Sequence, residues 1–239
     1  MDVAYKVKPT HFPLGGNKMK TKQSGFTLVE IAIVLVIIGL LLGGILKGQE
    51  MITQAKIKNV VNDFNGVTAA VNSYQDRYRA LPGDDLNASS RWSSQGAVSG
   101  NGDGVFGTAG TDLYNLAAGA PASAKENNLF WWHLRLAGFV GGSTASTTNS
   151  SVQQPANAAN GIMGVQTTGM GFTSNIVCSS NLPDKIAIAV DTQMDDGAST
   201  TGQVRGLAQA APNPTTGFVA PNSAYAETGT NQYLLCKNM

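Results

Sequence analysis

Residues 22–39 read KQSGFTLVEIAIVLVIIG, and they place one acid, Glu30, inside an apolar run that extends from Phe26 to Leu46. As a helix these 21 residues would span roughly 32 Å, which is long enough to cross a bilayer. An unpaired charge near the centre of such a helix costs about 2.5–3.5 kcal/mol on insertion scales. The stretch therefore predicts a membrane helix in which Glu30 has a specific role.

The charges of the chain are unevenly distributed. Five of the 16 Lys and Arg residues, but only one of the 15 acids, precede Gly25. A basic flank before an apolar helix stays on the cytoplasmic side of a membrane, so the rest of the chain is expected outside the cytoplasm. The remainder has no basic face, which argues against nucleic acid as a partner. Its abundant Gly, Ser, Thr and Asn predict a loop-rich domain with β-structure.

A second periodic pattern continues beyond the apolar run. Apolar residues recur there at alternating spacings of three and four, at Ile57, Val60, Phe64, Val67, Val71, Tyr74 and Tyr78. The spacing predicts one helix from Phe26 to Arg79, apolar all round in its first part and amphipathic in its second. Leu81-Pro82-Gly83 should end it. A globular domain is therefore expected to pack on the amphipathic part.

Two simpler explanations of the apolar run are a secretory signal and a plain membrane anchor. A secretory signal normally ends in a small-x-small cleavage site, whereas this run continues into polar helix formers. A plain anchor would account for the run but not for Glu30. A further alternative is that Glu30 lies at the bilayer edge, hydrated by lipid headgroups, and has no role.

The N-terminal region resembles the type IV pilin and pseudopilin family. The matching residues are Gly25-Phe26-Thr27-Leu28-Val29-Glu30 and the apolar run after them. They repeat the family's basic leader ending in Gly, then Phe, then Glu at the fifth mature position. The resemblance implies that prepilin peptidase cleaves after Gly25 and methylates the new amino group of Phe26. The leader is longer than many, so both Met1 and Met19 could be the start, and glycines replace a proline found in many pilin helices.

The resemblance also implies a partner for Glu30. Cleavage would create an amine at Phe26, and a free α-amine has a pKa of about 7.7–8.0. Opposite charges about 4 Å apart attract by roughly 4 kcal/mol at an effective dielectric near 20. Glu30 of an incoming subunit is therefore expected to pair with Phe26 of its neighbour. The implied partners are other copies or homologous pilins, prepilin peptidase, an inner-membrane assembly platform, and the membrane before assembly.

The implied fold is α+β, a long N-terminal helix packed against a small antiparallel sheet. Four parts are expected: a cleaved leader (1–25), a transmembrane and filament-core helix (26–46), its amphipathic continuation (47–80), and a pilin-like head (81–239).

Within the head, short β-like runs predict strands at 176–178, 185–191 and 232–236. Residues 125–138 predict a short helix with Leu129, Trp132, Leu136 and Phe139 on its apolar side and with Trp131 and His133 at its margin. The low-complexity stretch 141–161 predicts a surface loop.

The chain has two cysteines, Cys178 and Cys236. An even pair in an exported domain more often forms a disulfide than a metal or redox site. Pilins often have a disulfide that brackets the C-terminal region, and this spacing is compatible with one.

One loop of the head has the composition of a calcium site. Ser99-x-Asn101-x-Asp103-Gly104 places oxygen-bearing side chains at alternating positions before a glycine, as calcium loops do. The first position is Ser rather than Asp, however, and position twelve is Gly110 rather than Glu, so an ordinary turn is the alternative. Asp84 and Asp112 are further candidate ligands of this structural calcium, and no other cofactor is expected. A weaker metal candidate is the turn containing Asp191, Asp195 and Asp196.

The sequence predicts a structural subunit rather than an enzyme. It has no HExxH, no nucleophile elbow and no workable Cys–His pair, and beyond the leader only His133 could serve a triad. The predicted protein begins as a single-pass bacterial inner-membrane precursor with a cytoplasmic N-terminus and ends in a periplasmic or extracellular filament, a type IV pilus or a related one. Three alternatives stay open: a minor pseudopilin of a type II secretion system, a low-copy minor pilin that acts as a binding or adhesion module, and an anchored domain that never polymerises.

Overall fold

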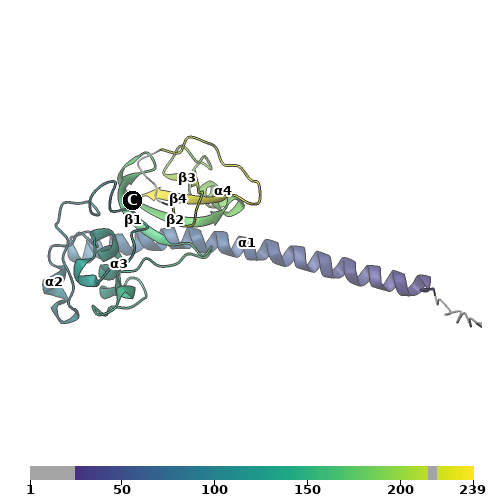
Figure 1. Cartoon of the computed structure of the whole chain (residues 1–239), viewed down its shortest axis with the longest axis horizontal. Coiled ribbons are helices and arrows are strands. Elements are labelled where there is room, and N and C mark those ends of the chain that lie inside the picture. The colour runs from purple at the N-terminus through teal and green to yellow at the C-terminus, as the bar shows by residue number, and fades with distance from the viewer. Residues whose placement is uncertain (1–24, 215–219) are drawn as a thin grey trace, which may run out of the picture. The chain divides into compact units, whose positions relative to one another are not determined.

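The computed structural model describes residues 25–214 and 220–239. The predicted leader, with both candidate start methionines, therefore lies outside the described residues except for Gly25. The chain divides into two compact units, the first ending at Lys47 and the second beginning at Gly48. Helix α1, Leu28–Tyr78, contributes to both units, and each unit is described by itself (Figure 1).

In the first unit, α1 is apolar and exposed on all sides. Leu28 is 86% exposed and Leu40 is 74% exposed, and no residue from Gly25 to Leu46 is buried. The helix is long and apolar enough to cross a membrane, with an 18-residue window of mean hydropathy 2.8. Exposed apolar surface of this extent is stable only in lipid or against other apolar helices.

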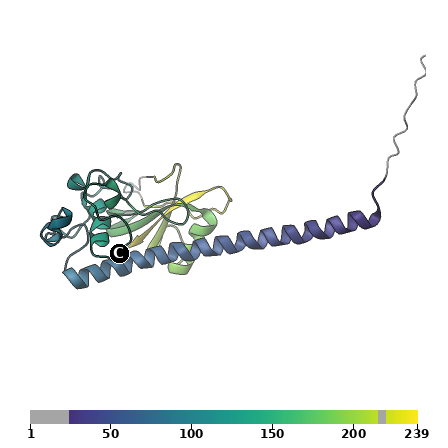
Figure 2. The ribbon, with the colours of Figure 1, turned by 90° about the horizontal axis from the view of Figure 1, so that it is seen from below.

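The second unit is built on a four-stranded antiparallel sheet. Its strands are β1 (Met163–Gly169), β2 (Phe172–Pro183), β3 (Val204–Ala208) and β4 (Gln232–Asn238), in the order β1-β2-β4-β3. Helix α4 (Asp184–Met194) follows β2 directly in the sequence. Helices α2 (Ala88–Arg91) and α3 (Glu126–Leu136) belong to the part of the sequence that connects α1 with β1 (Figure 2). This arrangement confirms the predicted α+β fold with a long N-terminal helix.

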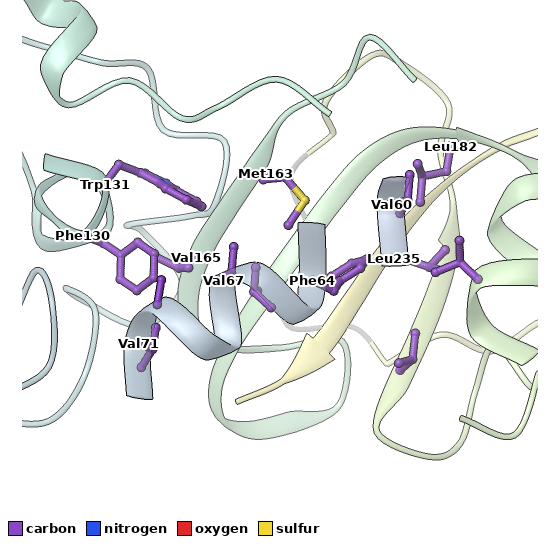
Figure 3. Packing of buried hydrophobic residues seen from close by; sticks show 14 of the residues in the cluster. Val60, Phe64, Val67, Val71, Phe130, Trp131, Met163, Val165, Leu182 and Leu235 are labelled. Atoms are coloured by element: carbon purple, nitrogen blue, oxygen red, sulfur yellow. The ribbon is translucent and has the colours of Figure 1, made fainter. Parts of the chain in front are cut away.

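The core of the second unit forms on one face of α1. Val60 and Phe64 are fully buried, and Val67 and Val71 are nearly so. Figure 3 shows them facing side chains of the sheet and of α3, among them Met163, Val165, Leu182, Leu235, Phe130 and Trp131. Each fully buried aliphatic or aromatic side chain contributes about 1.5–3 kcal/mol relative to an exposed one. The stripe predicted from the sequence is therefore the face on which the head folds.

The predicted strand at 185–191 is wrong, because these residues form most of helix α4. The alternation of Ile186, Ile188 and Val190 suggested a strand with one buried face. In the structure the buried residues include Ile186, Ala187, Val190 and Asp191, a spacing of one, three and one that matches the helical repeat. Pro183 stands just before the first turn, where a helix tolerates proline.

Two strands, β1 and β3, were not predicted. Strand β1 is rich in Gly, Thr and Gln, yet Gln166 is only 1% exposed because its side chain accepts a hydrogen bond from the Tyr114 amide at 3.0 Å. Gly164 lies so close to Tyr114 that a Cβ atom would come within 2.0 Å of the carbonyl oxygen. The strand is thus defined by contacts with a distant loop, which no local pattern reveals.

The two cysteines form a disulfide between neighbouring strands. Cys178 of β2 and Cys236 of β4 are register partners, and both are fully buried. In the chain-entropy model, closing a loop of this length stabilises the fold by about 3–4 kcal/mol. The bond fastens the C-terminal strand into the middle of the sheet.

Helix α3 buries Trp131 and His133 more deeply than a position at its margin implies. Trp131 and His133 were expected at its margin, but Trp131 is 1% exposed and His133 is fully buried. The Nδ1 atom of His133 accepts a hydrogen bond from the Gly83 amide at 2.9 Å, and Nε2 donates to the Val98 carbonyl at 2.8 Å. His133 therefore holds the turn after α1 against the loop that follows α2.

The stability of the second unit should depend on pH through His133. Burial lowers the pKa of His133 from 6.5 to about 4, so between these values the unfolded chain binds a proton that the folded chain does not. Stability should therefore fall as the pH drops from about 6.5 towards 4, by about 3 kcal/mol in total from this group. We expect the melting temperature of the full chain in detergent to fall more between pH 7 and pH 5 than that of His133→Gln. Equal slopes for the two proteins would contradict this assignment.

Candidate functional site

The peptide bond between Gly25 and Phe26 lies just before helix α1. Residues 25–27 are not helical, and the Phe26 side chain is 83% exposed. Thr27 is the residue from which the helix starts, since its carbonyl accepts the amide of Ile31 at 3.3 Å. A peptidase could therefore reach this bond without unwinding the helix.

The Glu30 side chain folds back onto the first turn of α1. Its carboxylate accepts hydrogen bonds from the amide of Thr27 at 2.8 Å and from the Thr27 hydroxyl at 2.9 Å. In return the Thr27 hydroxyl oxygen accepts the amide of Glu30 at 3.3 Å. This reciprocal pair is a capping box, in which each side chain satisfies an amide that the helix leaves unpaired.

The capping box accounts for only part of the cost of placing Glu30 in an apolar segment. A helix cap is worth about 0.5–2 kcal/mol, whereas a charge at the centre of a membrane helix costs about 2.5–3.5 kcal/mol. The box does determine where the carboxylate lies: it contacts the amide of Thr27, the residue that follows Phe26. The Thr-x-x-Glu spacing before an apolar run is a known signature of such a box, so the sequence could have revealed this role of Thr27.

A second group of functional candidates comes from the turn before α2, the loop between α2 and α3, and the first turn of α3. Carboxylate oxygens of Asp84, Asp103 and Glu126 lie within 4.8 Å of one another. The Asp84 carboxylate also accepts three loop amides, those of Gly102 at 2.5 Å, Asp103 at 3.1 Å and Gly104 at 2.7 Å. Asp84 therefore holds the loop in place and contributes negative charge to its inner side.

The predicted ligands Asn101 and Asp112 occupy different positions in this region. Asn101 donates from its side chain to Asp103 at 3.0 Å, so it lies at the cluster. Asp112 accepts the amide of Thr108 at 2.8 Å and is not among the three clustered carboxylates. Asn101, Asp103, Asp112 and Glu126 nevertheless line one cavity of about 490 Å³. Of the predicted ligands, the structure thus brings Asp84, Asn101 and Asp103 together.

Glu126 is the member of the cluster that the sequence interpretation missed. Burial raises the pKa of Glu126, and the neighbouring charges of Asp84 and Asp103 raise it further. The hydrogen bonds that its carboxylate accepts from the amides of Asn101 and Gly107 lower the pKa but do not cancel this rise. Such crowding of carboxylates is relieved by a hard cation with oxygen ligands, such as calcium. Glu126 lies in the first turn of α3, where an acid is expected for the helix dipole alone, so its sequence position did not indicate a ligand.

The weaker metal candidate also has its carboxylates close together. Oxygens of Asp191, Asp195 and Asp196 lie within 4.8 Å of one another. Asp191 is fully buried and accepts a hydrogen bond from the hydroxyl of Tyr225 at 2.5 Å, while Asp195 and Asp196 accept amides of the following loop. These bonds fix the loop between α4 and β3.

Calcium binding at the first cluster remains a prediction, and melting experiments can test it. If calcium binds there, adding it to the full chain in detergent should raise the melting temperature, because the cation offsets the repulsion between Asp84, Asp103 and Glu126. The double variant Asp103→Asn with Glu126→Gln should lose this rise. The matched control Glu227→Gln, an exposed acid outside both clusters, should keep it. An unchanged calcium response in the double variant would contradict this site.

Comparison with known proteins gives one match, and it covers the N-terminal site. The family described as the prokaryotic N-terminal methylation motif matches residues 20–46. No curated protein and no solved structure matches the chain. The match includes Gly25, Phe26, Thr27 and Glu30 together with the exposed apolar part of α1. The chain therefore carries the prepilin cleavage and methylation motif of type IV pilins and pseudopilins at residues 20–46.

Proposed function

We propose that this protein is a structural subunit of a type IV pilus or a related filament and assembles through helix α1. The observation that carries the proposal is the Glu30 carboxylate, which is held at the N-terminal turn of a helix that is otherwise apolar and fully exposed over residues 31–46. The motif and the apolar helix fit a single-pass membrane precursor. Prepilin peptidase would act on it after Gly25 at the cytoplasmic face.

Assembly follows from the chemistry of the cleaved end. Hydrolysis of the Gly25–Phe26 bond leaves an ammonium group on Phe26, next to Thr27 and one helical turn from Glu30. Inside a bundle of apolar helices, neither charge has water around it, so each requires an opposite charge. A pair about 4 Å apart, one partner from each of two subunits, supplies roughly 4 kcal/mol at an effective dielectric near 20 and offsets the insertion cost. The inner-membrane platform would present the subunits to one another.

The same contacts would serve a pilus, a secretion pseudopilus or a minor subunit. The head is the part that differs between such machines, because it presents the loops that partners would meet. We favour the pilus subunit as the function, with a minor pseudopilin or an adhesive minor pilin as the alternatives. Purified filaments distinguish these alternatives, since a major subunit makes up most of their mass.

The role of Glu30 can be separated from its capping function by two variants. Gln can take the place of Glu in a capping box but has no charge, whereas Ala provides neither. We expect Glu30→Gln and Glu30→Ala to reduce the yield of sedimented filaments alike, by at least about tenfold, which corresponds to about 1.4 kcal/mol. Thr27→Ala weakens the cap and leaves the charge, so it should keep most of the yield. Normal filaments from Glu30→Gln would contradict the proposed charge pairing.

Processing can be tested directly on the protein taken from the membrane or from filaments. Mass spectrometry of the N-terminal peptide should show Phe26 as the first residue, with one methyl group on its nitrogen. Gly25→Val should block this product, because a β-branched side chain would then stand at the scissile bond. A mature chain that still begins at Met1 or Met19 would contradict the assignment of the cleavage site.

A further inference from the structure

A groove beside α1 contains a carboxylate, that of Asp63, that has no partner among the described residues. The groove has a volume of about 250 Å³ and is lined by Asp63 and Val67 of α1, by Trp131 of α3, and by Phe139, Val140 and Met163. Among the described residues, no hydrogen bond or ion pair reaches the Asp63 carboxylate.

The Asp63 carboxylate indicates the chemistry of the occupant. Asp63 is half-buried, and burial raises its pKa with no neighbouring charge to oppose this. A carboxylate in such surroundings binds a cation in preference to remaining unpaired. Apart from Asn62, the rest of the lining is apolar or aromatic, which suits the methylene stem of a lysine and favours an ammonium group near the rings. The groove therefore fits a lysine side chain.

Helix α1 itself carries a lysine in a matching position. Lys56 precedes Asp63 by seven residues, which is about 10.5 Å along the axis and within about 20° of the same face. Both are half-buried, and each stands one residue before a buried member of the stripe, Ile57 and Phe64. No ion pair reaches Lys56 from the described residues of its own chain. In two parallel copies displaced along the axis, Asp63 of one copy would come level with Lys56 of the other.

We propose that the groove at Asp63 receives the Lys56 side chain of a second copy of this chain, forming an additional ion pair between subunits. The proposal rests on the proposed function, because it requires copies of α1 to pack in parallel. Pairing of Glu30 with a neighbour's Phe26 needs a displacement of four residues, or about 6 Å, in the same direction. The length of a lysine side chain covers the difference of about 4 Å between the two displacements. One neighbour can therefore satisfy both pairs.

Charge reversal in the full-length, processed protein tests this pair. Asp63→Lys and Lys56→Asp should each lower the yield of filaments by at least about tenfold, or about 1.4 kcal/mol. The double swap should recover to within about threefold of wild type, because the opposite charges face each other again. The matched control is Asp76→Lys, which changes an acid on α1 that is 86% exposed and pairs with Arg79 of its own chain. Its yield should stay at the wild-type level.

A cross-linking experiment covers the case in which a charge reversal impairs folding. Filaments are formed from a mixture of Asp63→Cys and Lys56→Cys subunits and treated with a short thiol cross-linker. The native disulfide is fully buried, so the new thiols should be the ones that react. A dimer that contains one subunit of each kind is the expected product.

The outcomes distinguish failure of this pair from failure of the proposed function. If Glu30→Gln abolishes filaments while Asp63→Lys does not, the ion pair is refuted and the proposed function stands. If the double swap is no better than the single variants and no mixed dimer forms, the ion pair is also refuted. Cross-linking of position 63 only to a different protein would refute a second copy as the occupant. If the wild-type chain forms no filaments, both proposals fail.

Discussion

In the proposed function, the organisation of this protein depends on one carboxylate, that of Glu30, which must be neutralised in an apolar environment. Glu30 interrupts the apolar first part of α1, whose side chains up to Leu46 are all exposed in the single chain. Its hydrogen bonds to Thr27 stabilise the start of the helix, but a cap is worth less than the insertion cost of the charge. The proposed pairing supplies a positive partner, which cleavage at the adjacent Gly25–Phe26 bond would create. Processing and assembly would thus be coupled through a single ion pair.

In the second unit, the apolar surface of the helix is covered by the head of the same chain. From Ile57 onward only one face of α1 is apolar, and that face is covered by the sheet and by α3. The end of the helix is secured by buried polar groups: Tyr74 donates to Asp85 at 2.7 Å, and Arg91 also contacts this carboxylate. Burial opposes the ionisation of Asp85, yet these two hydrogen bonds, the amide of Asn87 and the charge of Arg91 together lower its pKa. The head is thereby fixed to one face of α1, while Lys56 and Asp63 lie at the edge of that face.

The sequence predicted those features that depend on local periodicity and missed those that depend on distant contacts. The stripe from Ile57 to Tyr74, helix α3 and the strands around Cys178 and Cys236 could be predicted because each has a repeat or a composition of its own. Strand β1 could not be predicted, since the hydrogen bond that its buried Gln166 accepts from the distant Tyr114 amide leaves no trace in the local sequence. The acidic cluster could be predicted only in part for the same reason. The local motif indicated Asp103 as a ligand, whereas Glu126 belongs to helix α3, further along the chain.

The central claim concerns a contact between subunits, and the most direct test is to observe it. Filaments can be assembled from equal amounts of two chains, one labelled with ¹⁵N at the Phe26 amine and the other with ¹³C at the Glu30 carboxyl group. Solid-state NMR then detects a dipolar coupling only if the two atoms lie close together in different copies. We predict a coupling that corresponds to a nitrogen–oxygen separation within roughly 4 Å, as in an ion pair. If the coupling is absent from the mixed filaments and appears only when one chain carries both labels, Glu30 is neutralised within its own subunit and the account is contradicted.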